Sequence, residues 1–229
     1  MVSLKGIVLG ILVIIIVYFL ITWIFSDKSR TYLLTKHNAK TQTSVSPSNI
    51  VNSYNSDYTY SFWVFISNWN YNLGKVKNIL TRGDFLSVDL DSTINNLSVS
   101  LATITDSKNQ SKQNCILPNI PLQTWANVII SLNDRALDIY LDGKLVKTCV
   151  SPGVPVQRSG TPLEVCKNGG FDGFLSSLSY YSRAINPREA YAIYKDGPGG
   201  GSWFSNIINK YRLKIAFMED NKEVNSLEI

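Results

Sequence analysis

The chain has 229 residues, a formal net charge of +5 and a pI near 9.0, and 45% of its residues are hydrophobic. The positive charge does not indicate nucleic-acid binding, because the Lys and Arg residues are scattered and form no basic stripe. A single histidine, His37, and three widely spaced cysteines argue against a zinc site and against a Ser-His or Cys-His catalytic pair in the main domain. We therefore expect no nucleic-acid partner and no metal or other cofactor.

The first apolar segment predicts a membrane anchor. Residues 6–25 carry no charge and are rich in Ile, Val, Leu and Phe, and a helix of this length spans a hydrocarbon core about 30 Å thick. Tyr18 and Trp23 lie towards its far end, where such rings favour the membrane interface. A cleaved signal peptide is the alternative, but its apolar region is usually about 7–15 residues long, and no small-residue cleavage site follows. We predict an uncleaved single-span anchor over residues 1–26.

Residues 27–56 are predicted to be a spacer beside the membrane. The densest basic group, in DKSRTYLLTKHNAK, directly follows the anchor, which indicates an orientation signal or contact with anionic lipid head groups. Residues 38–56 are rich in Asn, Ser and Thr and have little to bury, as is typical of a linker. The lipid membrane is thus one predicted partner.

From Tyr58 onwards the hydrophobic pattern has a period of two. YTYSFWVFIS predicts a long strand, and shorter alternating runs follow in VKNILTR, FLSVDL, LSVSLATI and TWANVIISL. The run ALDIYLDGKLVKTCV predicts a hairpin, because Asp142-Gly143 suits a two-residue type I′ turn. Counting back from this turn predicts one core face made of Leu137, Ile139, Leu141 and Val146, with Tyr140 on the other face. The whole pattern predicts antiparallel sheets packed as a sandwich.

One short helix is predicted near residues 187–195. Asn186 is a good N-cap, Pro187 occupies the first helical position and Glu189 the third, which is a capping-box arrangement, and Gly197 marks the stop. GPGGGS then predicts a flexible joint, and the last residues predict a small hairpin that turns at Asp220-Asn221. The predicted division is an anchor (1–26), a spacer (27–56), a sandwich (57–197), and a joint with a tail (198–229).

Two stretches of the sandwich carry a resemblance. TWANVIISLNDRALDIYLDGKLV, followed by FDGFLSSLSYYSRAINPREAYAIYKDG, resembles the concanavalin A-like lectin/glucanase fold in its laminin-G-like form. The matching residues, in order, are Trp125, Asp142, Gly143, Phe171, Gly173, Tyr181, Arg183, Ala184 and Tyr194. The resemblance covers about residues 58–196 and implies an all-β, antiparallel jelly-roll β-sandwich. It is weak for function, because this fold hosts many functions.

A narrower resemblance concerns the arrangement of the chain. A short N-terminal anchor, a Cys before PLQTW, the run YLDGKLVKTC and a tail after KDGPGG together resemble membrane proteins of large DNA viruses of algae and amoebae. Such proteins are similar to minor capsid or inner-membrane components. The resemblance implies capsid or other virion proteins as partners and the virion inner membrane as the location, with a host membrane as the alternative.

The carboxylates do not predict an enzyme. Glucanases of this fold share a Glu-x-Asp-x-x-Glu strand, whereas FLSVDLDS holds Asp89 and Asp91 and no Glu. Calcium would need clustered oxygen ligands, and Asp84 is the only further carboxylate nearby, so a solvated strand face is the simpler interpretation. We predict no catalytic and no metal-binding residue.

Glycan binding has one candidate loop. SNWNYNLG places Trp69 and Tyr71 among four asparagines, a composition that suits a shallow sugar site. The alternative, which we prefer, is that Trp69 packs against the edge of the sandwich, because large aromatic side chains are buried on average. Two hypotheses for function follow. The first is a structural protein that links a membrane to a capsid shell, and the second is a membrane-anchored lectin for host attachment.

The cysteines and the flanking charges predict opposite compartments. Cys115 and Cys149 flank the central strands and favour a disulfide that leaves Cys166 free, although three cysteines allow three pairings. More Lys and Arg follow the anchor than precede it, so the positive-inside rule places the sandwich in the cytosol, where disulfides are rare. The viral resemblance would reconcile the two, because such viruses assemble in the cytosol and often carry their own thiol oxidases.

Overall fold

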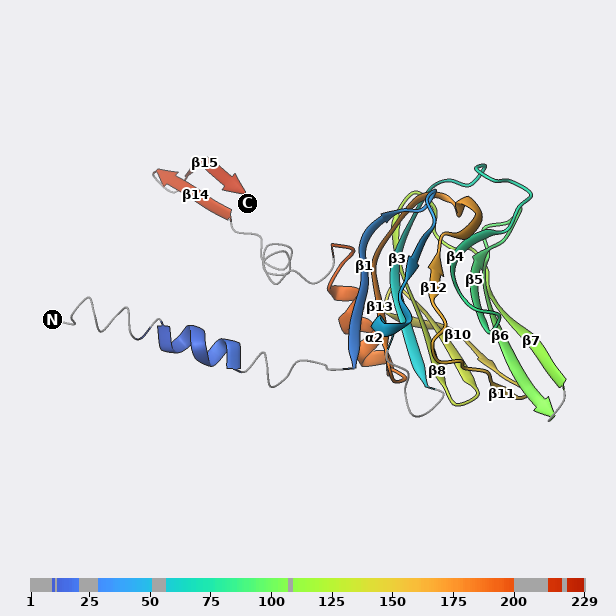
Figure 1. Cartoon of the computed structure of the whole chain (residues 1–229). Coiled ribbons are helices and arrows are strands. Elements are labelled where there is room, and N and C mark those ends of the chain that lie inside the picture. The colour runs from blue at the N-terminus through green and yellow to red at the C-terminus, as the bar shows by residue number, and fades with distance from the viewer. Residues whose placement is uncertain are drawn as a thin grey trace. The chain divides into compact units, whose positions relative to one another are not determined.

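The computed structural model describes residues 10, 12–20, 29–50, 57–106, 109–199, 214–219 and 222–228. The chain divides into two units, Met1–Arg30 and Thr31–Ile229. In the first unit, residues 12–20 form an α-helix with exposed apolar side chains (Figure 1). Within these described ranges, no helix is long and apolar enough to cross a membrane. The predicted anchor, residues 1–26, lies partly outside the described residues.

The second unit is built on two packed antiparallel sheets (Figure 1). In spatial order, the six-stranded sheet holds β1 (Arg30–Asn38), β13 (Asp172–Tyr181), β3 (Tyr58–Asn68), β8 (Trp125–Asn133), β9 (Ala136–Leu141) and β10 (Lys144–Val150). The seven-stranded sheet holds β11 (Val154–Pro155), β6 (Leu97–Asp106), β5 (Leu86–Leu90), β4 (Lys77–Arg82), β12 (Leu163–Val165) and β2 (Thr43–Val45), with β7 (Asn109–Leu117) also on β6. Short 3-10 turns, η1 (Pro47–Asn49) and η2 (Lys167–Gly169), complete the connections. The predicted all-β sandwich is confirmed.

The core fills the space between the sheets. Along β3, every second side chain points inwards and is buried; these residues are Tyr58, Tyr60, Phe62, Val64 and Ile66. They meet apolar side chains of the opposite sheet, among them Val88 of β5 and Val99 of β6. Full burial of one such side chain contributes about 1.5–3 kcal/mol. The period of two in the sequence therefore marks the faces that hold the sandwich together.

Residues 30–50 belong to the sandwich, which corrects the predicted spacer over residues 27–56. β1 lies beside β13 and β2 pairs with β12, and Ala39, Val45 and Ile50 are buried in the core. The polar composition did not indicate strands because β1 and β2 lie at the edges of their sheets, where strands carry polar residues on their open side. The sandwich therefore begins near residue 30, and not at residue 57.

A disulfide joins the edge strands of the two sheets. Cys115 of β7 is bonded to Cys149 of β10, with an S–S distance of 1.99 Å and 6.0 Å between the Cα atoms. This is the pairing that the sequence favoured among the three. Cys166 is a buried free thiol, and its burial raises its pKa to about 12.

The β9–β10 hairpin turns where the sequence predicts but has a different register. Asp142 and Gly143 have φ values of 50° and 73°, as a type I′ turn requires. A bulge follows in β10, so that Lys147 and not Val146 lies opposite Ile139. Val146 is 43% exposed, and its predicted place on the core face is wrong because one extra residue in a strand reverses the faces beyond it.

The helix α2 (Pro187–Lys195) covers part of the outer face of the six-stranded sheet. A small apolar cluster lies between them; it comprises Ile129, Tyr140, Tyr181, Ile185 and Ala190, with Ile193 packed against it. The predicted capping box is confirmed, because the Asn186 side chain accepts from the Glu189 N–H and the Glu189 carboxylate accepts from the Asn186 N–H. Tyr140, predicted opposite the core, is buried because α2 covers that face.

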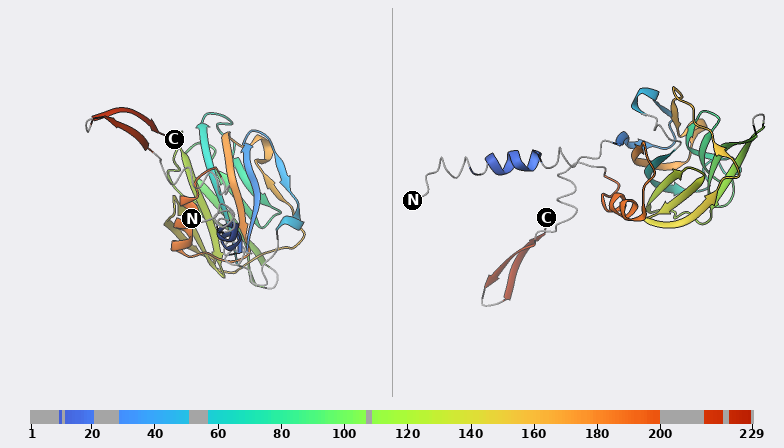
Figure 2. Two further views of the ribbon diagram at one scale, coloured as in Figure 1. Left: turned by 90° about the vertical axis from the view of Figure 1, so that its left-hand side faces the viewer. Right: turned by 90° about the horizontal axis from the view of Figure 1, so that it is seen from below.

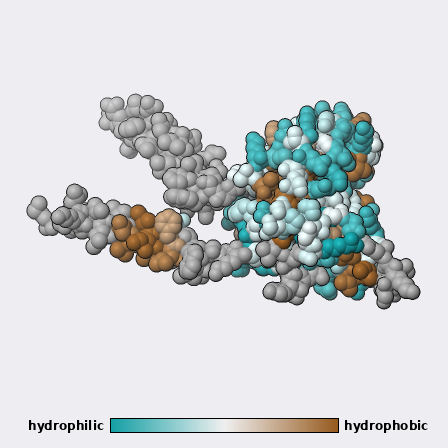
Figure 3. Space-filling model, in the orientation of Figure 1, coloured by the Kyte–Doolittle hydropathy of each residue, from teal (hydrophilic) through white to brown (hydrophobic). Residues whose placement is uncertain are grey.

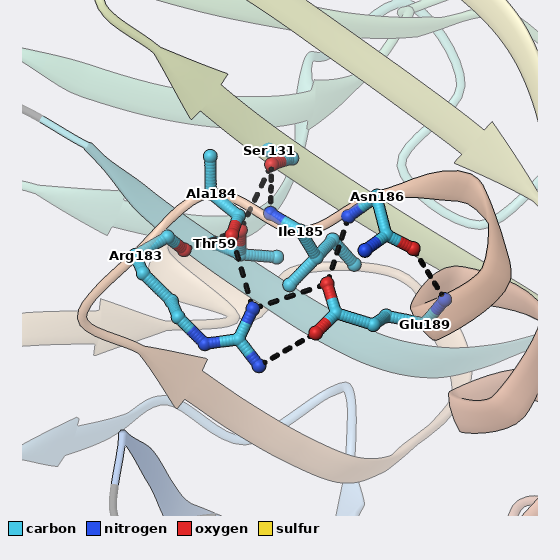
Figure 4. Close-up of polar contacts among 7 residues, drawn as sticks. All are labelled: Thr59, Ser131, Arg183, Ala184, Ile185, Asn186 and Glu189. Carbon is cyan, nitrogen blue, oxygen red and sulfur yellow. Dashed lines mark hydrogen bonds and ion pairs between the residues drawn. The ribbon is translucent and has the colours of Figure 1, made fainter.

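A polar clasp fastens the start of α2 to the sheet (Figure 4). The guanidinium of Arg183 pairs with both carboxylate oxygens of Glu189, at 2.9 and 3.1 Å. The Ile185 N–H donates to Ser131 Oγ at 3.0 Å, and Thr59 Oγ1 lies 2.9 Å from the Arg183 carbonyl oxygen. We define the clasp as Arg183, Glu189 and these partners. The Tyr-x-Arg-Ala stretch of the family resemblance thus has a structural role here.

The tail contains the predicted hairpin. β14 (Lys214–Glu219) pairs antiparallel with β15 (Lys222–Glu228) in a separate two-stranded sheet, and Glu219 lies opposite Lys222. The predicted turn residues, Asp220 and Asn221, lie outside the described residues.

Candidate binding site on the outer sheet face

An aromatic row crosses three neighbouring strands on the outer face of the six-stranded sheet. Phe174 of β13 lies opposite Phe65 of β3, which lies opposite Trp125 of β8. The rings of Phe65 and Trp125 are 5.5 Å apart and tilted by 53°. Phe174 is 37% exposed, and the other two side chains are half-buried. The row therefore presents ring surface to solvent. In the same sheet, α2 covers part of the outer face (Figure 2, left).

A pocket of about 280 Å³ adjoins this row, and Trp125 is one of the residues that line it. We call it the outer-face pocket; it is lined by Thr35, Lys36, Trp125, Ser176, Pro198 and Gly199. β1 and β13 supply three of these residues, and the chain returns after α2 to supply the last two. Its volume is near the lower end of the range for ligand sites, about 300–1,000 Å³.

Serine side chains hold the returning chain in place. Ser176 Oγ lies 2.5 Å from the Pro198 carbonyl oxygen and 2.7 Å from the Thr35 carbonyl oxygen. Ser177 Oγ donates to the same Pro198 oxygen at 3.0 Å. These bonds connect the wall after α2 to β1 and β13, so that the pocket is preformed.

The outer-face pocket carries a positive charge. Lys36 lines it, and the Lys36 ammonium lies 4.9 Å from the centre of the Phe174 ring. No carboxylate is among the residues that line it. A cation over an aromatic face is favourable, and the same ammonium can donate hydrogen bonds to hydroxyl or anionic groups of a ligand. The pocket thus combines flat apolar surface with a few polar donors.

The loop that the sequence predicts as a sugar site makes contacts within the protein. Trp69 is half-buried against the core, its indole N–H donates to the Thr93 carbonyl oxygen at 3.1 Å, and the Lys77 ammonium lies 4.5 Å from its ring centre. Tyr71 is half-buried, with the Lys40 ammonium 5.0 Å from its ring. These contacts agree with the packing role preferred for Trp69. Whether either residue binds a sugar stays a prediction.

The turn residues and the carboxylates lie outside the pocket. A Cβ at Gly143 would lie 3.0 Å from Tyr191 Cα and from Tyr194 Cβ, which places the turn against α2. Asp89 accepts from Asn78 Nδ2 at 2.8 Å. Backbone N–H donors hold the pKa of Asp91 below its usual value. Among the described residues, no group of three or more His, Cys, Asp or Glu side chains could hold a metal ion.

Sequence reasoning missed the pocket, although one signal was present. In SFWVFIS, aromatic residues lie on both faces of the strand: Phe62 points inwards, and Trp63 and Phe65 point outwards. A strand that is apolar on both faces is usually covered on both. Trp63 is covered, since its ring stacks on Tyr194 of α2 at 5.6 Å, whereas Phe65 lies only half-buried in the row. Thr35 and Lys36 gave no signal, because they fell within the predicted spacer.

Comparisons with known proteins agree with this fold. The profile of a family described as the concanavalin A-like lectin/glucanases superfamily matches residues 38–190, more than half of the chain. The binding domain of botulinum neurotoxin DC, solved in complex with rat synaptotagmin II, is similar with a TM-score of 0.55 and 15% identity over 73% of this chain and 46% of that chain. The binding domain of Paraclostridial Mosquitocidal Protein 1 is similar with a TM-score of 0.55 and 16% identity, over 74% of this chain and 46% of that chain.

A third similar structure is the receptor binding domain of botulinum neurotoxin mosaic serotype C/D, with a TM-score of 0.56 and 12% identity over 70% of this chain and 41% of that chain. The chain spans less than half the length of these structures, and at such identity the likeness shows the fold alone. These three neighbours are toxin domains and give the predicted likeness to viral minor capsid proteins no support. By its match over residues 38–190, the chain belongs to the concanavalin A-like lectin/glucanase superfamily.

Proposed function

We propose that the protein is a membrane-tethered, non-enzymatic binding module that holds a carbohydrate ligand in the outer-face pocket. The observation that carries this proposal is that Trp125, the last residue of the aromatic row, and Lys36 line the same preformed pocket. The apolar face of a sugar ring can stack on Trp125, while its hydroxyl groups bond to the few polar groups around it. Apolar walls with a small number of placed polar groups are typical of small-ligand sites.

The charge of the pocket favours an acidic glycan. Lys36 is the one charged residue among those that line the pocket, and it can form a charge-assisted hydrogen bond with a carboxylate or sulfate on the sugar. Such a contact is partly screened by salt. We therefore expect the affinity for an acidic glycan to fall as the ionic strength rises, and the affinity for a neutral glycan to change little.

The similar solved structures support a binding role but do not name a ligand for this chain. They are binding or receptor-binding domains of toxins, and a fold of this kind hosts many functions. The membrane tether rests on the uncharged residues 6–25. The link between a membrane and a capsid shell stays a prediction that the comparisons do not support, and no observation on the sandwich favours it.

A glycan array probed with the full chain in detergent tests the proposal, followed by calorimetry with the best ligand. Trp125→Ala and Lys36→Ala should each weaken binding tenfold or more, because both line the pocket. Tyr71→Ala is the matched control, since it removes a half-buried aromatic ring outside the pocket, and it should bind as wild type does. Loss of binding in Tyr71→Ala but not in Trp125→Ala would move the site to the loop. A chain that binds no glycan would refute the proposal.

A further inference from the structure

The two ends of the sandwich differ in their distance along the chain from the predicted anchor. We define the near end by the start of β3 at Tyr58 and the end of β13 at Tyr181, which adjoin in the sheet because Tyr181 pairs with Thr59. β1 begins there as well. The N–H of Ala39, directly after β1, donates to the Gly173 carbonyl oxygen, and the Thr35 carbonyl oxygen of β1 accepts from Ser176, so β1 runs antiparallel to β13. The far end holds residues 69–76, which follow β3. Figure 1 shows β1 rising from the near end.

Apolar side chains are exposed at the near end. Val150 is the last residue of β10 and lies opposite Ala136, the first residue of β9. Ala136 in turn lies opposite Asn133 at the end of β8, next to the residue that pairs with Tyr58, so Val150 is at the near end. Val154 of β11 lies opposite Ile104 of β6. Val150, Val154 and Ile104 are 65%, 55% and 46% exposed, and Figure 3 shows apolar surface beside β11. We call these three residues the near-end patch.

The chain that enters the near end is short. The predicted anchor includes the uncharged residues up to Phe25, and β1 begins at Arg30. The four residues between them span at most about 14 Å when fully extended. A membrane that holds residues 6–25 therefore holds the start of β1 within that distance. β1 is one edge strand of the six-stranded sheet and β10, which ends at Val150, is the other, so the near-end patch lies at the same end of the sheet but across its width.

We propose that the near-end patch rests in the interfacial region of the bilayer that anchors the chain, an inference that depends on the proposed membrane tether. The patch is too small to bind a membrane by itself. Because the tether keeps the patch close to the bilayer, the effective concentration of one relative to the other is high, and even a weak apolar contact forms for much of the time. Scattered exposed apolar residues are common in soluble domains, and Leu73 and Val76 are exposed at the far end as well. The near-end residues differ in lying at the end of the sandwich that the tether enters. The sandwich would then stand end-on to the membrane.

Site-directed bimane fluorescence in the full chain tests this arrangement. Val154→Cys, in a Cys166→Ala background, is labelled and reconstituted into phosphatidylcholine vesicles with or without brominated lipids. Val76→Cys is the matched control, because Val76 is a 64% exposed valine at the far end. We expect brominated lipids to quench the label at residue 154 at least twofold more than the label at residue 76.

The outcomes separate the patch from the tether. Equal quenching at both positions, in protein that floats with the vesicles, would overturn the patch and leave the tether intact. Protein that does not float with the vesicles would overturn both. A label at residue 154 that is protected from aqueous iodide but not quenched by brominated lipids would show that a second copy covers the patch, and would also overturn the proposal.

Discussion

Removing the disulfide should destabilise the sandwich by about 3.8 kcal/mol. Cys115 and Cys149 are separated by 34 residues. A cross-link that closes a loop of this length lowers the conformational entropy of the unfolded chain, which raises the free energy of unfolding by about 3.8 kcal/mol at 25 °C. The bond connects β7 to β10, which belong to different sheets, so it constrains a contact that no ladder of backbone hydrogen bonds replaces. For a domain of about 150–250 residues, the loss corresponds to a fall in Tm of about 8–15 °C.

The assay is thermal and urea unfolding of the full chain in nanodiscs, comparing wild type with the double variant Cys115→Ala/Cys149→Ala. Reduction of the wild type should reproduce the effect of the double variant, and reductant should not change the variant further. Cys166→Ala is the control for loss of a buried thiol without a disulfide. A double variant that unfolds within 1 kcal/mol of wild type, or peptide mapping that finds Cys166 in a disulfide, would refute the reasoning.

Three further predictions concern single residues. Gly143→Val should cost at least about 1–2 kcal/mol for its positive φ, and more than Gly74→Val, which has a positive φ but no neighbouring atom within 4 Å; equal losses in denaturation would mean that α2 does not press on the turn. Glu189→Gln should cost about 1 kcal/mol or less, since the ion pair of the clasp is partly exposed. Glu164→Gln should lower the free energy of unfolding by less than Glu189→Gln, because Glu164 forms an ion pair with Lys167 but makes no helix-capping hydrogen bond. Cys166 should resist alkylation at pH 8 until the chain unfolds, because burial raises its pKa to about 12 and only the thiolate reacts; mass spectrometry of the native chain checks this.

The elements that the sequence predicted well depend on neighbours a few residues apart. The capping box needs only Asn186 and Glu189, and the turn of the hairpin needs only Asp142 and Gly143, since each motif satisfies its hydrogen bonds or φ angles locally. The alternation in YTYSFWVFIS likewise marks an inward face along one strand. Such features can be predicted from the sequence because the interactions that produce them are made within the segment itself.

The features that were missed depend on residues far apart in the chain. β1 is a strand because β13, more than 130 positions later, offers it an edge, and nothing in its polar composition shows this. The bulge that exposes Val146 is a property of the paired strands and not of β10 alone. The outer-face pocket joins Lys36, Trp125 and Pro198, which only the folded sheet brings together. A binding site made of residues that are distant in the sequence cannot be predicted from local sequence patterns.

The two proposed contacts lie in different parts of the sandwich, and this makes them compatible. Trp125 opens β8 at the end farther from Tyr58, whereas the near-end patch includes Val150, the last residue of β10, which lies at the Tyr58 end. A ligand could therefore enter the outer-face pocket without displacing the bilayer from the near end. If both contacts used the same end, ligand and membrane would compete. It follows that Trp125→Ala should weaken glycan binding tenfold or more and leave the lipid quenching of a label at residue 154 unchanged, so that each proposal is tested by a separate measurement.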